Sequence, residues 1–270
     1  MKTLGKLSAY FISELYNQNK IIFTISDAQK ILKKSYNETT DFLSKLVTRK
    51  IISRLKAGKF LIIPQEMGNI NNYTGNLYVA GREIVNSKQY YIAYYSAMSF
   101  RGMLTQPLNT LYIATAKRQI IPKQMNGKVT FVFINKNFMW GIKEEWVTRS
   151  EKVKVSDLEK TILDSLYHPE YSGGITEIAK GIWIVKDKID FNKLHDYVHL
   201  YNKNIIAKRL GYILEILNIN KEDILKFLKE YVKDRYDLFD STLDKKKLNE
   251  NKWRLIDNVG QKQILNIIKY

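Results

Sequence analysis

The chain has 270 residues, of which 45% are hydrophobic and 26% are charged, so it can form a sizeable core and is long enough for two domains. It has no cysteine, which excludes disulfides, thiol catalysis and every zinc site that uses thiolate ligands. The longest apolar stretches run for about eight residues, well short of the roughly 18 that a membrane span requires, and the N-terminal segment lacks the apolar core of a signal peptide. We therefore expect a soluble, cytoplasmic protein.

Charge is distributed unevenly along the chain. Lysine and arginine number 44 against 27 aspartate and glutamate residues, a formal net charge of +17. Residues 1–70 hold 12 basic and 5 acidic side chains, residues 71–150 hold 10 and 3, and residues 151–270 hold 22 and 19. Because cations that neutralise phosphates release counterions, a polyanionic partner of the first half is the simplest interpretation. The alternative is a generally lysine-rich proteome, although this does not explain the asymmetry.

Helical periodicity begins close to the N-terminus. Residues 4–16 place four apolar side chains on one face of a predicted helix: Leu4, Leu7, Phe11 and Leu15. After a short β-branched run at 21–25, Ser26 with Gln29 forms a capping box that predicts the start of a second helix, and Ser35 with Glu38 predicts a third. Two capped helices so close together are typical of a helix-turn-helix.

A predicted hairpin completes this N-terminal module. Residues 51–63 form two β-rich runs around a turn that contains Gly58, and Pro64 follows the second run. The order helix, strand, helix, helix, hairpin is that of a winged helix-turn-helix. The sequence therefore predicts a DNA-binding domain at residues 1–67, although some winged helices bind protein instead.

The third helix and the hairpin supply candidate DNA contacts. Short polar and cationic side chains on the exposed face of the helix could form hydrogen bonds with base edges: Asn37, Thr40, Ser44, Lys45 and Thr48. Residues near the helix ends and the hairpin tip could contact phosphates: Lys34, Ser35, Tyr36, Arg49, Arg54, Lys56 and Lys59. Asp41 on the same helix could accept a hydrogen bond from a cytosine amine or lie off the interface.

The stretch 68–75 is rich in Asn and Gly and predicts a linker to a second domain at residues 76–270. In that domain residues 76–104 are predicted to be helical, most clearly from Tyr90 to Leu104. Strands are expected at 111–116, 128–134, 138–148 and 152–155. Ser156 with Glu159 predicts another helix start, and four amphipathic helices, a short strand near Trp253 and a last helix follow. The predicted fold class is α+β: an N-terminal winged helix-turn-helix, then a larger domain with a small sheet covered by helices.

Residues suited to catalysis or metal binding are sparse. His195 and His199 lie one helical turn apart, but the glutamate of a metalloprotease helix is missing between them, so a structural role is favoured. Asp157 and Glu159 suit the N-terminal dipole of their helix, and Asp164 is expected to form a salt bridge rather than an acid–base pair. Common glycine-rich phosphate loops are also missing. The sequence predicts no enzyme activity, no catalytic residue, no cofactor and no bound metal.

Several segments carry a resemblance to a known family through their order and spacing. These segments are Tyr95–Met98 with Arg101–Leu104, Tyr112–Thr115 with Lys117–Arg118, Ser156–Asp164, Pro169–Glu170 with Gly173–Ile175, and Ala207–Glu215. Nearly the whole chain resembles the AbiEi-type antitoxin family, the transcriptional-regulator half of abortive-infection toxin–antitoxin pairs. Lys160 stands where this family more often has arginine.

The resemblance implies a repressor of its own operon, with the winged helix on promoter repeats of double-stranded DNA. It also implies that the second domain is needed to neutralise a nucleotidyltransferase-like toxin, by binding either the toxin or its target. The chain lacks the Gly-Ser pair and the Asp-x-Asp of such toxins. Arg101, Lys117 and Arg118 are candidates for an antitoxicity surface if the fold brings them together. The alternatives are an orphan regulator without a toxin, a nucleic-acid-modifying enzyme, and a winged helix that binds protein.

Overall fold

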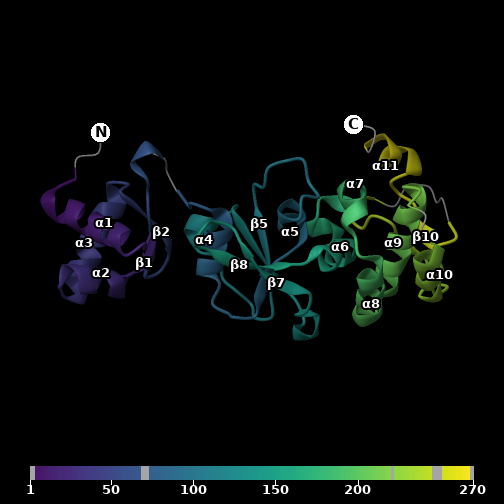
Figure 1. Ribbon diagram of the computed structural model, residues 1–270, viewed down its shortest axis with the longest axis horizontal. Coiled ribbons are helices and arrows are strands. Elements are labelled where there is room, and N and C mark those ends of the chain that lie inside the picture. The colour runs from purple at the N-terminus through teal and green to yellow at the C-terminus, as the bar shows by residue number, and fades with distance from the viewer. Residues whose placement is uncertain (1–3, 68–72, 220–221, 245–250, 268–270) are drawn as a thin grey trace. The chain divides into compact units, whose positions relative to one another are not determined.

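The computed structural model describes residues 4–67, 73–219, 222–244 and 251–267, which form a mixed α+β protein with small sheets (Figure 1). Of the predicted linker, residues 68–72 lie outside the described ranges. None of the helices within those ranges is both long enough and apolar enough to cross a membrane.

The chain divides into two compact units that are not contiguous in sequence. The first unit consists of residues 1–86 together with 120–129, and the second consists of residues 87–119 together with 130–270. A short segment from the middle of the chain is therefore part of the N-terminal unit.

Three helices and a three-stranded antiparallel sheet begin the first unit. Its elements are α1 (Lys6–Asn17), β1 (Ile22–Thr24), α2 (Ile25–Leu32), α3 (Tyr36–Thr48), β2 (Ile52–Lys56), β3 (Lys59–Ile62), a 3-10 helix at Gln65–Met67, α4 (Leu77–Ile84) and a 3-10 helix at Lys123–Met125. The strand order is β1-β3-β2, with Ile22 opposite Leu61 and Ile52 opposite Ile62. The predicted helices and hairpin are thus present, and the hairpin turns at Gly58, whose φ of +72° favours glycine.

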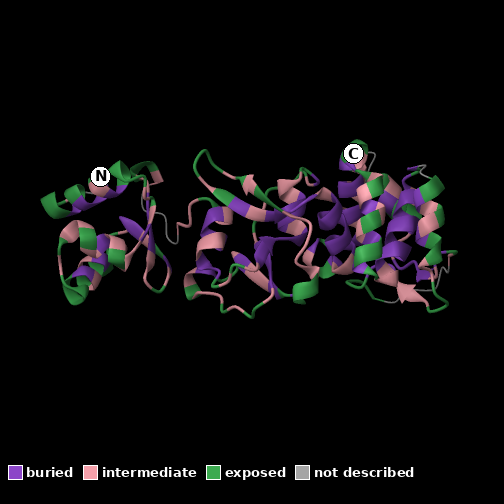
Figure 2. Cartoon of the chain, turned by 60° about the horizontal axis from the view of Figure 1, so that its bottom comes forward, coloured by how far each residue is buried: buried purple, intermediate pink, exposed green. Residues whose placement is uncertain are grey.

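The core of the first unit lies between the helices and the sheet (Figure 2). The rings of Phe11 and Phe23 meet edge to face with centroids 5.4 Å apart, and Leu43 and Leu46 of α3 are at most 1% exposed. Such close packing of large apolar side chains is the main source of stability for a unit of this size.

The prediction that Leu7 lies on the apolar face of the first helix is wrong. Leu7 is exposed, and Ser8 is buried in its place. The buried positions of α1 are Ser8, Phe11, Ile12 and Leu15, which follow the i, i+3, i+4, i+7 spacing of one helical face. A spacing of four from Phe11 back to Leu7 also fits that period, but the larger side chains at Phe11, Ile12 and Leu15 set which face turns inward.

The start of α2 differs from the prediction because another capping box forms. The Thr24 hydroxyl accepts a hydrogen bond from the Asp27 amide (3.2 Å), and the Asp27 carboxylate accepts one from the Thr24 amide (2.9 Å). The predicted box of Ser26 with Gln29 is therefore wrong, since Ser26 already lies inside the helix. Either capping box would satisfy the free amides at the start of the helix. The box at Thr24 forms because β1 ends at Thr24 and α2 follows directly.

A five-stranded mixed sheet forms the base of the second unit. Its strands are β4 (Tyr90–Ile92), β5 (Leu111–Thr115), β6 (Val129–Phe133), β7 (Ile142–Trp146) and β8 (Lys152–Ser156). In the order β6-β5-β4-β8-β7, the central strand β4 is antiparallel to β5 and parallel to β8. β7 is shorter than predicted because a 3-10 helix at Lys136–Phe138 and a turn at Gly141 precede it.

The strand β4 replaces part of a predicted helix. The sequence predicts helix from Tyr90 to Leu104, whereas α5 covers only Tyr94–Phe100. Tyr90 pairs with Thr115 on one side of β4, and Ile92 lies beside Val155 on the other. Because both edges of β4 form sheet hydrogen bonds with distant segments, tertiary pairing overrides the local periodicity, and the aromatic and β-branched side chains suit a buried strand.

Helices fill the rest of the second unit and pack together beside the sheet (Figure 1). They are α6 (Leu158–Tyr167), α7 (Gly174–Val185), α8 (Phe191–Tyr201), α9 (Asn204–Ile216), α10 (Glu222–Glu230) and α11 (Gln261–Ile267), with the short strands β9 (Asp237–Leu238) and β10 (Leu255–Ile256) between α10 and α11. The predicted apolar faces of these helices form one core. Residues 245–250 of the predicted charged connector and residues 268–270 of the predicted last helix lie outside the described ranges.

Two cations of α9 are buried and hold the chain that follows α10. Lys208 donates hydrogen bonds to the Arg235 carbonyl and to Asp237. Arg209 donates to three carbonyls, those of Leu166, Leu238 and Phe239. Burial lowers the pKa of Arg209 to about 10, and the carboxylates of Asp240, Glu170 and Asp237 oppose that shift.

The N-cap of α6 is Asp157 rather than the predicted Ser156. The Asp157 carboxylate accepts a hydrogen bond from the Lys160 amide (3.0 Å) and pairs with Lys193 of α8 (2.9 Å). The Ser156 hydroxyl instead lies 2.7 Å from the Thr161 hydroxyl. The expectation that Asp157 suits the helix N-terminus is confirmed, whereas the predicted capping box is wrong.

A buried ion pair between Lys160 and Asp164 lies at the centre of the second unit, and neither side chain is more than 1% exposed. The hydroxyls of Tyr91 and Tyr201 donate to the Asp164 carboxylate at 2.8 and 3.0 Å. The Lys160 ammonium lies 4.2 Å from the centroid of the Trp140 ring, a cation–π contact. Burial lowers the pKa of Lys160, and the carboxylate of Asp164 opposes that shift. The expected salt bridge of Asp164 is confirmed.

We predict that Asp164→Ala destabilises the protein by about 3–5 kcal/mol, because it leaves the buried Lys160 ammonium without its carboxylate. Lys160→Met should cost less, since methionine fills much of the same space and two tyrosine hydroxyls still donate to Asp164. The measurement is urea unfolding followed by tryptophan fluorescence, with Asp196→Ala, an exposed carboxylate of α8, as the control. A loss below about 1 kcal/mol for Asp164→Ala would contradict the structural role assigned to the pair.

Candidate nucleic-acid interface

The helix α3 presents a polar face to solvent. Ser35 and Glu38 form the predicted capping box at its start: the Ser35 hydroxyl accepts from the Glu38 amide (3.4 Å), and the Glu38 carboxylate accepts from the Ser35 amide (3.1 Å). Hydrogen bonds from Ser35 and Lys34 lower the pKa of Glu38 to about 2. The cap therefore fixes the helix start, and Lys34 lies beside it through its ion pair with Glu38 (3.2 Å).

The candidate base-reading residues lie on the solvent side of α3. Asn37, Ser44, Lys45 and Thr48 are exposed and Thr40 is half-buried. The hydroxyls of Thr40 and Thr48 donate to helix carbonyls, those of Asn37 and Ser44, at 2.9 and 3.1 Å. The structure thus brings these five side chains onto one helix surface, with Tyr36 (57% exposed) at its N-terminal end and Arg49 at its C-terminal end.

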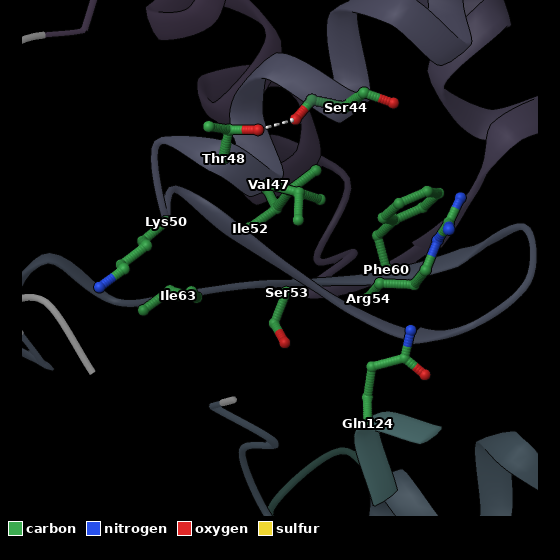
Figure 3. Close-up of a pocket in the computed structure, with 10 residues that line it drawn as sticks. All are labelled: Ser44, Val47, Thr48, Lys50, Ile52, Ser53, Arg54, Phe60, Ile63 and Gln124. Atoms are coloured by element: carbon green, nitrogen blue, oxygen red, sulfur yellow. Dashed lines mark hydrogen bonds between the residues drawn. The ribbon is translucent and has the colours of Figure 1, made fainter. Parts of the chain in front are cut away.

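A groove of about 320 Å³ adjoins the C-terminal half of α3 (Figure 3). Its polar and cationic lining residues are Ser44, Thr48, Lys50, Ser53, Arg54 and Gln124. Its apolar lining residues are Val47, Ile52, Phe60 and Ile63. The described lining residues combine hydroxyls, an amide and two cations, and no acidic side chain is among them. This environment suits an anion such as a phosphate group. The sequence indicates Lys50 as a cation beside this helix, but it does not indicate Ser53 or Gln124.

The cations of the hairpin are held in different ways. The Arg54 guanidinium lies over the Phe60 ring, 5.5 Å from its centroid. Lys56 donates to the side-chain carbonyl of Asn86 (2.8 Å), and Lys59 forms an ion pair with Glu83 of α4. The sequence places Lys56 and Lys59 at the hairpin tip, but does not show that residues at and just after α4 supply them with partners.

The Glu83 carboxylate forms ion pairs with two cations. Arg82 reaches the same carboxylate at 2.7 Å, on the oxygen that Lys59 does not use. Burial raises the pKa of Glu83, but hydrogen bonds from Lys59 and Arg82 outweigh it and lower the pKa overall. Burial and the neighbouring charge of Lys59 lower the pKa of Lys56. Glu83 is therefore ionised at neutral pH and offsets part of the positive charge of the hairpin.

The three candidates for an antitoxicity surface are not brought together. Arg101 donates to the Ser156 carbonyl (2.8 Å) and pairs with Glu145 (2.7 Å), and its side chain is only 16% exposed. Ser156 follows Val155, which lies beside Ile92 of β4, whereas Lys117 follows Thr115, which pairs with Tyr90. Because β4 runs parallel to β8 and antiparallel to β5, these two places lie at opposite ends of the strands.

Arg118 remains near Lys117, with its guanidinium 5.6 Å from the centroid of the exposed Phe133 ring. Arg101, at the end of α5, therefore bonds to residues of β7 and β8. Lys117 and Arg118 form a separate, exposed cationic patch on the second unit.

His195 and His199 lie on the side of α8 that contacts α10. The His195 ring packs on Phe227 with centroids 3.7 Å apart, and His199 Nδ1 lies 2.7 Å from the Tyr231 hydroxyl. Each imidazole thus has an aromatic neighbour on α10 or just after it, and the described residues hold no group of three His, Asp or Glu side chains arranged to bind a metal ion.

The structure is similar to the crystal structure of the RV2827C protein from Mycobacterium tuberculosis, with a TM-score of 0.74 and 12% sequence identity over 99% of this chain and 96% of that chain. No family model matches the sequence, and no curated protein is significantly similar to it. At this level of identity the likeness shows the shared α+β fold along nearly the full length of both chains.

We predict that Arg101→Ala destabilises the protein by about 1.5–3 kcal/mol, because it removes two charge-assisted hydrogen bonds from a mostly buried site. Lys117→Ala combined with Arg118→Ala should change stability by less than about 0.5 kcal/mol, since exposed cations contribute little. Thermal and urea unfolding of both variants gives the comparison. Equal stability of the two variants would show that Arg101 is as dispensable as the exposed pair.

Proposed function

We propose that the chain is a sequence-specific repressor that binds double-stranded DNA through its first unit. One observation carries the proposal: the exposed polar face of α3 adjoins a groove whose described lining residues include cations and hydroxyls and no carboxylate. The arrangement of α2, α3 and the hairpin, with sheet order β1-β3-β2, supports the interpretation of this unit as a winged helix-turn-helix. In such a module α3 is the helix that enters the major groove.

The proposed contacts divide into two classes. Asn37, Thr40, Ser44, Lys45 and Thr48 read base edges from the major groove. Phosphate contacts come from the residues that flank this face: Lys34, Ser35, Tyr36, Arg49, Arg54, Lys56 and Lys59. The excess of positive charge in the first half of the sequence favours this assignment, because it supplies the electrostatic component of DNA binding.

We further propose that this repressor is the autoregulating antitoxin of an AbiE-like toxin–antitoxin pair and acts in the cytoplasm. This part rests on the sequence segments that resemble the AbiEi-type family, and its partner would be a nucleotidyltransferase-like toxin or the target of that toxin. Lys117 and Arg118 stay candidates for that contact, while Arg101 is better explained by its role in packing. A nucleotidyltransferase-like gene beside this one would favour the antitoxin over an orphan regulator.

Single substitutions should distinguish the residues that contact bases from those that contact phosphates. We expect Asn37→Ala or Ser44→Ala to reduce the preference for the specific site over random duplex by about 1–3 kcal/mol if the residue makes a good base contact. Arg54→Ala should weaken binding to both duplexes equally. The site is first selected from a library of random duplexes with the full-length chain, and affinities are then measured by fluorescence anisotropy.

Lys6→Ala, which removes an exposed cation at the start of α1, is the matched control for Arg54→Ala. If the wild-type chain selects no sequence and binds no duplex at low salt, the proposed function is wrong. If Arg54→Ala removes only the specific preference, the two classes of contact are assigned the wrong way round.

Removing the carboxylate of Glu83 should strengthen DNA binding. Glu83→Gln removes the carboxylate that pairs with Lys59 and Arg82 and raises the net charge by one beside the hairpin. If one more phosphate is then neutralised, the slope of log affinity against log salt steepens by about 0.9. Glu14→Gln on α1 makes the same change of charge away from the hairpin and serves as the control. Equal salt slopes for the two variants would mean that the hairpin does not contact DNA.

A further inference from the structure

The groove beside α3 has a second wall that comes from the middle of the chain. Residues 120–129 belong to the first unit although more than thirty residues of the second unit precede them. Their 3-10 helix Lys123–Met125 contacts β2, and Gln124 lines the groove on the side opposite Ser44 and Thr48 (Figure 3). The N-terminal 86 residues alone do not complete this groove.

The position of this segment is fixed by burial and by its own turns. Met125 is fully buried and anchors the segment. The Met125 amide donates to the Pro122 carbonyl (2.8 Å), and the Lys128 amide donates to the Met125 carbonyl (3.0 Å). Lys123 is exposed and directly precedes Gln124, so an anchored turn places a cation and an amide side by side at the edge of the groove.

The segment and the opposite wall of the groove both present hydrogen-bond donors or cations. Residues 120–129 contain two lysines and no acidic residue. Across the groove, α3 and β2 offer the hydroxyls of Ser44 and Ser53, and the lining cations are Lys50 and Arg54. The Thr48 hydroxyl also lines the groove but donates to the Ser44 carbonyl. Donors on both sides, and no carboxylate among the lining residues that the structure describes, suit a sugar–phosphate backbone that enters the groove. Each phosphodiester presents only acceptors and one negative charge.

We propose that the turn at residues 122–128 is part of the DNA-binding surface, with Lys123 and Gln124 contacting the sugar–phosphate backbone on the side of the groove opposite α3. This inference rests on the proposed function and adds a contact that neither the helix-turn-helix nor the hairpin provides. The interface is then built from two separate parts of the sequence. The DNA backbone lies between α3 on one side and the turn at 122–128 on the other. Gln124 donates from its amide, and Lys123 neutralises a phosphate.

The experiment uses the full-length chain, the duplex that it selects and a random duplex of equal length. Lys123→Ala combined with Gln124→Ala should weaken binding to both duplexes about eightfold at 0.1 M salt and reduce the salt slope by about 0.9, the contribution of one phosphate contact. The control combines Lys136→Ala with Asn137→Ala, which removes a lysine and an amide from an exposed 3-10 turn of the second unit. Thermal unfolding of each variant verifies that both are folded.

A second measurement does not depend on the stability of the alanine variants. Since the natural chain has no cysteine, Lys123→Cys introduces a unique thiol for an iron chelate that cleaves nearby DNA backbone. Strand cleavage at a defined position from Lys123→Cys, and none from Asn137→Cys, is the expected result.

The failures of the two proposals are distinguishable. If the wild-type chain binds DNA but the alanine pair matches its control and the chelate at position 123 gives no cleavage, the inference is wrong and the proposed function stands. If the wild-type chain binds neither duplex, the proposed function itself fails, and the inference fails with it. Equal weakening by the pair and its control would show a general effect of net charge and would also overturn the inference.

Discussion

The fully buried pair of Lys160 and Asp164 sets the arrangement of the second unit. Two charges removed from water gain little net stability from each other, but once buried they require partners in fixed places. Tyr91 of β4 and Tyr201 of α8 supply hydroxyls to the carboxylate, and the Trp140 ring covers the ammonium. At Gly141, whose φ is +63°, an added Cβ would lie 2.9 Å from Cβ of Lys160, so the backbone approaches α6 where a side chain would collide. The need to satisfy this buried ion pair thus positions β4, α6 and α8 relative to one another.

Cations have different roles in the two units: several are buried in the second unit, whereas those of the groove and the hairpin lie at the surface of the first. In the second unit, Lys160, Lys208 and Arg209 are buried and bonded to carboxylates or carbonyls, so they maintain the fold. All three lie in segments on which the proposed relationship to the AbiEi-type family rests, and in the structure these three residues build the interior. In the first unit, Lys50 and Arg54 line an open groove, and Lys56 and Lys59 lie on the hairpin, where Asn86 and Glu83 bind them. The proposed DNA binding and the proposed antitoxin activity therefore rest on different residues and can be tested separately.

Local patterns in the sequence were sufficient where the determinants are local. The capping box of Ser35 with Glu38, the apolar faces of the later helices and the hairpin at Gly58 each depend on residues within a few positions of one another. The strand at Tyr90–Ile92 was missed because its partners lie far along the chain. The ion pair of Lys59 with Glu83, and the approach of Gln124 to β2, were unpredictable for the same reason: no short motif encodes a contact between segments that tertiary packing brings together.

The discontinuity of the first unit has a consequence for how the protein is made. Chains grow at about 5–20 residues per second, so several seconds separate the synthesis of α4 from that of the turn that ends near residue 129. During that interval the helices α1 to α3 and the hairpin exist without the wall that Met125 anchors. By the time this turn arrives, the strands β4 and β5 of the other unit have also been synthesised. A nascent chain therefore acquires its complete groove only after it has begun the second unit, and a message that terminates early yields a product that lacks one side of that groove.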